Sequence, residues 1–132
     1  MRTLTIITII LAAGAAITFT CQTLSRHEAA VWRSMEGEFA KIDPPGGSIS
    51  TSGRDGLRSI ERHYLFFSGN PSPETVIAHY RRELVEAGWR EVTVDPSSSE
   101  MCWERPDFRV IVRAGDRSGE TRFTVRIETA SC

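Results

Sequence analysis

Two cysteines near the end of the chain have residue types and spacing suited to a covalent crosslink. Cys102 and Cys132 lie in segments that we expect to pair in the last β-hairpin. Two registers of that hairpin are open, with Val110 facing either Val125 or Phe123, and both bring the cysteines within about one residue of each other across the ladder. A disulfide bond worth ~3–4 kcal/mol is predicted, which implies an oxidising compartment; two unpaired thiols are the alternative.

Four arginines are predicted to share one face of the same hairpin. Side chains alternate between the two faces of a strand, so the apolar residues face the core and the arginines face the other way. The set is Arg109, Arg113, Arg122 and Arg126. Guanidinium groups bind phosphate and carboxylate well, so this face is a candidate anion-binding surface for lipid head groups, a cell-wall polymer or an acidic partner. The alternative is a solvated face whose charge Glu104, Glu120 and Glu128 balance.

Other chemistry is not indicated by the sequence. His27, His63 and His79 form no HxxxH or HxH pair, and no CxxC motif is present, so no metal site is predicted. The serine run 97–99 is expected to be a turn, since no nucleophile elbow surrounds it. No phosphate-binding loop occurs. We therefore expect no catalytic residue, no cofactor and no enzyme activity, and the net charge of -1 argues against a nucleic-acid partner.

The N-terminal segment carries the clearest targeting signal in the chain. Residues 3–20 contain no charge and follow a single Arg2, which predicts contact with a membrane through these residues. As a transmembrane helix the segment would span about 28 Å, close to the thickness of a bilayer core. A cleaved signal peptide, with Ala13-Gly14-Ala15 as its cleavage site, is a second interpretation. A lipoprotein signal acylated at Cys21 is a third, although Phe19 and Thr20 fit it badly.

The chain is expected to divide into four parts. Residues 1–21 are the signal-anchor or signal peptide, and residues 22–42 are an amphipathic stalk helix whose apolar residues recur on one stripe. Residues 43–56 are predicted to be a flexible linker, because Pro-Pro and Gly-Gly pairs end the helix. Residues 57–132 are the globular domain.

The domain is predicted to have an α+β fold. A strand over Ile60–Phe67 precedes a helix that Ser72 caps and Gly88 ends. Further strands are expected at 89–94, 101–104, 108–113 and 121–129, with a loop over 114–120. The resulting order is strand, helix, strand, strand, strand. It places one helix on a 4–5-stranded, mainly antiparallel sheet in two layers.

The run SPETVIAHYRRELVEAGW, after an aromatic strand and before a β-meander, resembles a helix of small bacterial exported or membrane-anchored α+β proteins. The resemblance implies a shared fold and carries over no catalytic residue. With the cysteines favouring export, it leads us to expect a bacterial envelope protein. The chain would be single-pass or exported, with its C-terminal domain on the periplasmic or extracellular side. We expect a non-catalytic binding or structural module; the alternative is a small ligand-binding or enzymatic domain that uses a cleft between helix and sheet.

Overall fold

The computed structural model describes residues 26–56, 58–68, 70–92 and 100–130. The chain falls into two compact units with a boundary between Ser34 and Met35, and each unit is described by itself. Residues 26–39 are helical, so the boundary lies within this helix. No helix in the described ranges is long and apolar enough to cross a membrane, and the predicted membrane segment 3–20 lies outside them.

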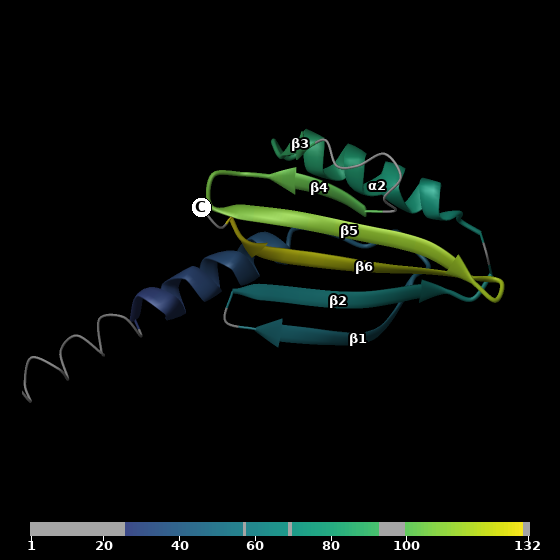
Figure 1. The fold of residues 1–132 in the computed structure, drawn as a ribbon, viewed down its shortest axis with the longest axis horizontal. Helices are drawn as coiled ribbons and strands as arrows, with labels where there is room; N and C mark the ends of the chain where they lie inside the picture. Colours follow the sequence, from purple (N-terminus) through teal and green to yellow (C-terminus); the bar gives the residue numbers. More distant parts are fainter. Residues whose placement is uncertain (1–25, 57, 69, 93–99, 131–132) are drawn as a thin grey trace, which may run out of the picture. The chain divides into compact units, whose positions relative to one another are not determined.

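The second unit is built on one six-stranded antiparallel sheet with a helix on one face (Figure 1). Its strands follow the order β1-β2-β6-β5-β4-β3 across the sheet. Their bounds are β1 Ile49–Gly56, β2 Ser59–Phe66, β3 Arg90–Val92, β4 Glu100–Glu104, β5 Phe108–Arg117 and β6 Glu120–Thr129. The helix α2 spans Pro73–Glu86. The predicted α+β class and the antiparallel sheet are therefore confirmed, with more strands than the 4–5 expected.

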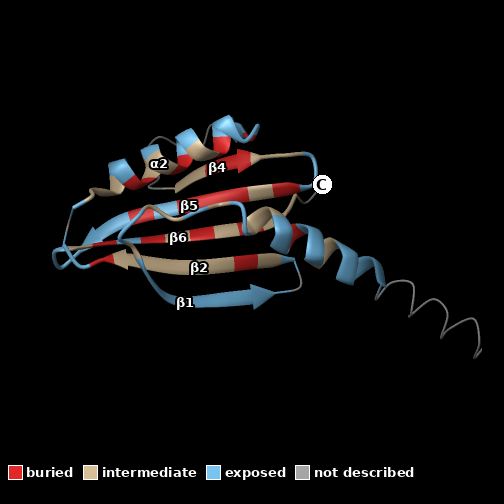
Figure 2. Ribbon diagram, turned by 180° about the vertical axis from the view of Figure 1, so that it is seen from behind, coloured by how far each residue is buried: buried red, intermediate tan, exposed pale blue. Residues whose placement is uncertain are grey.

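The hydrophobic core lies between α2 and the sheet. Val76, Tyr80 and Leu84 on one side of α2 are at most 2% exposed. On the sheet side, alternate residues of β5 and β6 are buried, which gives the red segments of Figure 2. The Tyr80 and Phe123 rings approach to 6.0 Å between centroids. The space between helix and sheet is thus filled by closely packed side chains.

Local signals in the sequence fix both ends of α2. The Ser72 Oγ accepts a hydrogen bond from the Thr75 backbone N–H at 3.3 Å, as expected of an N-cap. Gly88 adopts φ 88°, the left-handed conformation that ends helices. Before the helix, the buried Thr121 hydroxyl donates to the Pro71 carbonyl at 2.8 Å, which ties the helix start to β6.

Both predicted registers of the last hairpin are wrong. Val110 faces Ile127 and Val112 faces Val125. The cause is the turn, because β5 and β6 run on until only Ser118 and Gly119 connect them, with φ values of 54° and 77°. Positive φ at both positions is the geometry of a two-residue hairpin turn. The predicted loop over 114–120 therefore consists mostly of strand.

The predicted linker over 43–56 is also wrong in its second half. Residues 49–56 form β1, which pairs with β2 along its length apart from a register shift between Ser50 and Ser52. The stretch is polar on both faces, so it lacks the hydrophobic alternation by which a strand is predicted. The C-terminal end of the predicted stalk helix likewise belongs to the second unit, where Met35 is fully buried and Glu38 pairs with Arg105 at 2.9 Å.

Candidate anion-binding site

The sheet face opposite α2, here called the open face, carries all four arginines of the predicted set. Directly opposed residues of an antiparallel ladder point to the same side. In the observed register Arg109 lies opposite Glu128, Arg113 opposite Thr124 and Arg126 opposite Ile111. No arginine of the set therefore faces another, and the like-charge stacking that one predicted register required does not arise.

Arg109 and Arg126 are held in a network of carboxylates. The Arg109 guanidinium donates from Nε and Nη2 to Glu104 Oε1 at 3.2 and 2.9 Å, and it lies 3.9 Å from Glu128. The hydrogen bond to Glu104 is the main cause that raises the pKa of Arg109. Arg126 lies 3.3 Å from Glu128 and 3.9 Å from Glu61. With 33% and 39% of their side chains exposed, these two arginines are already neutralised by the protein.

Arg113 and Arg122 differ from that pair in exposure and in partners. Each makes an ion pair with one carboxylate, Arg113 with Glu100 and Arg122 with Glu120 at 2.8 Å. Their side chains are 66% and 59% exposed. Single ion pairs at such exposure contribute ~0–1 kcal/mol, so a ligand can displace the glutamate at little cost.

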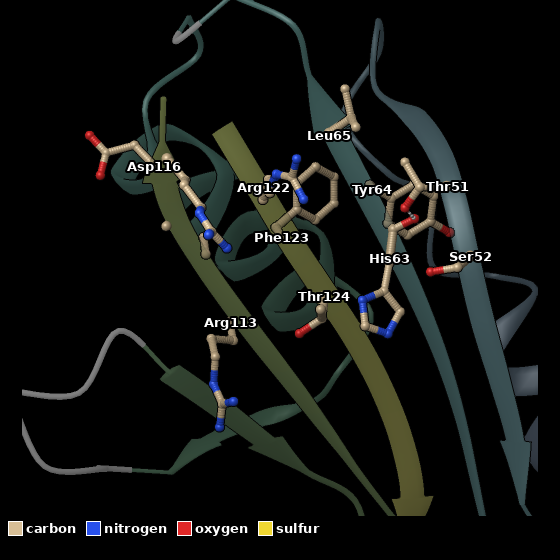
Figure 3. Close-up of a pocket in the computed structure, with 13 residues that line it drawn as sticks. Thr51, Ser52, His63, Tyr64, Leu65, Arg113, Asp116, Arg122, Phe123 and Thr124 are labelled. Atoms are coloured by element: carbon tan, nitrogen blue, oxygen red, sulfur yellow. Dashed lines mark hydrogen bonds between the residues drawn. The ribbon is translucent and has the colours of Figure 1, made fainter. Parts of the chain in front are cut away.

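The two exposed arginines border a depression of about 410 Å³ at the end of the open face nearest the β5–β6 turn. Figure 3 shows its side chains coming from the neighbouring strands β1, β2, β6 and β5. Gly115 lies opposite Arg122 and has no side chain, and a Cβ atom there would meet nothing within 4 Å. The missing side chain leaves an open floor between flanking arginines. We call this place the distal depression.

Three further titratable residues line the distal depression, namely Arg117, His63 and Asp116. Arg117 makes no ion pair within the described part of the chain. His63 lies opposite Ser52 on one side and Thr124 on the other, and its Nε2 lies 2.7 Å from Glu61 Oε1. Four residues with hydroxyl groups and an imidazole thus accompany three guanidiniums; the four are Thr51, Ser52, Tyr64 and Thr124. The sequence analysis missed Arg117 because it placed this residue in a loop. The Ser-Gly pair between two alternating runs is the signal that could have extended the strand.

The histidines do not gather into one site. His63 lies on the open face, whereas His79 lies on α2, on the other side of the sheet, with its Nε2 3.0 Å from the Asp43 carbonyl oxygen. No group of three or more metal-ligating side chains occurs in the ranges that the structure describes. The polar pocket between helix and sheet that the enzyme alternative requires is occupied there by the buried side chains of α2.

Cys102 does not lie on a strand that pairs with β6, as the disulfide prediction assumed. It sits in β4, which pairs with β3 and β5, so β5 separates it from β6. The thiol is free among the described residues and 8% exposed, and burial raises its pKa to about 11. Cys132 and Cys21 lie outside the described residues. The bond between Cys102 and Cys132 stays a prediction, but the strand pairing that suggested it is wrong.

No protein-family model, no curated protein and no solved structure matches the chain. On the predicted four-arginine face, the observed geometry marks the distal depression, in which exposed guanidiniums, a histidine and hydroxyl groups surround Gly115.

Proposed function

We propose that this protein is a non-catalytic binding module of a bacterial envelope that captures an anionic group in the distal depression. The hydrophobic residues 3–20 would tether or export it, as a membrane anchor, a cleaved signal or a lipoprotein signal acylated at Cys21. The binding domain, Met35–Cys132, would then lie on the periplasmic or extracellular side.

The observation that carries this proposal is that the arginines of the open face differ in exposure and in the number of carboxylates that pair with them. Arg109 and Arg126 share Glu128, each has a second carboxylate, Glu104 or Glu61, and both are less than two-fifths exposed. Arg113 and Arg122 keep one carboxylate each, and Arg117 keeps none among the described residues. Around the distal depression lie three guanidiniums, the two glutamates that pair with Arg113 and Arg122, and the carboxylate of Asp116.

The chemistry of the lining suits phosphate or carboxylate oxygens. Guanidinium groups donate two parallel N–H groups to such oxygens, and hydroxyl groups add neutral donors. Thr124 and Ser52 supply these hydroxyls at the floor and at the β1 side. Because the site is exposed, its affinity is expected to be moderate and to fall as salt concentration rises.

Calorimetric titration of the full chain in detergent with pyrophosphate, a compact polyanion, tests the proposal. We expect binding that weakens at least tenfold in the triple variant Arg113→Ser, Arg117→Ser, Arg122→Ser. The matched control removes three other exposed arginines in the triple variant Arg81→Ser, Arg82→Ser, Arg90→Ser. It should change the affinity less than threefold.

Two results would contradict the proposal. In one, both triple variants lose affinity for pyrophosphate equally, which would mean that binding depends only on the net charge of the protein. In the other, the wild-type chain does not bind pyrophosphate at low salt. The alternative function, an enzyme with a cleft between helix and sheet, has no observation in its favour, since Tyr80 and its neighbours fill that space.

A further inference from the structure

The strand β1 lies at the edge of the sheet and is exposed over its whole length. All eight of its residues are exposed, which makes the strand blue from end to end in Figure 2. It pairs with β2 on one side, and no strand in the described ranges pairs with its other side. Folded proteins usually protect such an edge with charged residues, proline, a β-bulge or a very short strand. β1 has a register shift between Ser50 and Ser52 and the charges of Arg54 and Asp55, so the stretch after the shift is regular strand with two charged residues. β1 contains no lysine and no proline.

The register shows which backbone groups of β1 point outward. β1 ends at Gly56 directly opposite Ser59, the first residue of β2, and the pair that closes so short a connection exchanges both hydrogen bonds. Hydrogen-bonded and non-hydrogen-bonded pairs then alternate along the ladder. Arg54 and Ser52 therefore bond to β2. Gly53 and Asp55 direct their N–H and C=O groups away from the sheet.

Most side chains of β1 are small. A Cβ atom on Gly53 would lie 2.9 Å from the Arg62 side chain, which crosses the strand there to pair with Asp55. The remaining residues near the bulge are Ser50, Thr51 and Ser52, none of which has a bulky side chain. A backbone approaching from outside meets small groups rather than a steric barrier.

The length of the regular edge favours an extended segment over a second folded copy. The regular part of β1 after the bulge, Ser52–Gly56, is about 17 Å long. An edge contact of this length between two folded domains buries far less than the ~1,200 Å² of a stable interface. An extended peptide gains its affinity from main-chain hydrogen bonds along such an edge and needs no second surface.

Charge decides the composition of that segment. Arg54 lies on β1, and Thr51 and Ser52 form the β1 wall of the distal depression with its three arginines. The one acidic residue of β1, Asp55, is neutralised by Arg62. We infer that β1 is a docking edge for an extended, acidic segment of a partner protein, which adds to the sheet as a seventh strand. The preference for acidic residues rests on the proposed function; the use of the edge does not.

Fluorescence anisotropy of a labelled peptide tests the inference with the full chain in detergent. The probe alternates valine and glutamate over eight residues, and the control peptide has lysine in place of glutamate. We expect the acidic peptide to bind at least tenfold more tightly than the basic one. Asp55→Pro removes an outward N–H and should weaken the acidic peptide at least tenfold. Asp55→Asn keeps the N–H and should change its affinity less than threefold.

Amide hydrogen exchange provides a second measurement that does not depend on the folding of a proline variant. In the wild-type chain, the outward amides of Gly53 and Asp55 should exchange at least tenfold more slowly with the acidic peptide present. Ser52 and Arg54, already bonded to β2, should change little. Unchanged exchange at Gly53 and Asp55, equal affinities of the proline and asparagine variants, or no binding of the acidic peptide at 1 mM overturns the inference.

The two proposals fail in different ways. Pyrophosphate does not need the edge, so Asp55→Pro should bind it like the wild type. If the acidic peptide slows exchange at Gly53 and Asp55 while pyrophosphate does not bind, the edge stands and the anion site fails. If pyrophosphate binds in an arginine-dependent way while both amides stay unprotected, the anion site stands and the docking edge fails.

Discussion

The two classes of arginine on the open face should differ in what they contribute to stability. Replacing Arg109 by serine leaves Glu104 and Glu128 with one cation fewer and removes a charge-assisted hydrogen bond of 2.9 Å. For a part-buried member of a network, the upper end of the range for surface ion pairs applies, about 1 kcal/mol. In a unit of about 100 residues this lowers Tm by roughly 4–8 °C.

Arg113→Ser should have a much smaller effect. Arg113 is 66% exposed and its described ion pair is with Glu100, so its removal should change the free energy of unfolding by less than ~0.5 kcal/mol, or under ~4 °C in Tm. Arg126→Ser should behave like Arg109→Ser, and Arg122→Ser like Arg113→Ser. Each pair is thereby a control for the other.

Thermal unfolding of the full chain in detergent, followed by near-ultraviolet circular dichroism, measures all four variants under one condition. We expect Tm to fall further in the Arg109 and Arg126 variants than in the Arg113 and Arg122 variants. Equal losses in all four, or a larger loss for Arg113 than for Arg109, would refute the division into structural and available arginines on which the binding site depends.

Three further predictions concern single residues. Thr121→Val leaves the Pro71 carbonyl without its buried donor and should destabilise the domain by about 1–3 kcal/mol, whereas Thr121→Ser should retain most of the stability. Gly119→Val places a β-branched residue at φ 77° and should lower stability by about 1–2 kcal/mol in a denaturant titration; no change would argue against the two-residue turn. The pKa of Cys102 is raised from 9.0 to about 11, so at pH 8 it should react with iodoacetamide roughly a hundredfold more slowly than in the unfolded chain. Because this folded-state pKa is raised, the stability of the wild type relative to Cys102→Ala should be highest below pH 9 and fall toward pH 11. Equal rates of iodoacetamide reaction in the folded and unfolded chains would contradict the burial of Cys102. Mass spectrometry of the alkylated, unreduced protein would also detect a disulfide bond to Cys132.

Elements with strong local signals could be predicted from the sequence alone. α2 has a capping serine, a proline in its first turn and a glycine at its end, and these act within a few residues. β2 and β6 alternate or concentrate apolar side chains enough to be recognised as strands. The four arginines were assigned to one face correctly because that assignment needs only the alternation within each strand.

Features that depend on long-range pairing could not be predicted in this way. β1 is polar on both faces, so its composition resembles that of a linker. It forms a strand because its backbone hydrogen-bonds to β2. The β5–β6 register depends on a turn of Ser118 and Gly119, and a loop two residues longer or shorter moves every cross-strand pair. Because the predicted register was wrong, it could not give the carboxylate partners of Arg109 and Arg126 or the place of Arg117 on the strand.

The most direct test of the anion site is nuclear magnetic resonance of the arginine Nε–Hε groups during a titration of the full chain with pyrophosphate. We predict saturable shifts at Arg113, Arg117 and Arg122. Arg109 and Arg126 should stay nearly unmoved, because carboxylates already pair with both guanidinium groups and the Arg126 Nε is buried. Shifts spread evenly over all arginines, or largest at Arg109 and Arg126, would contradict it.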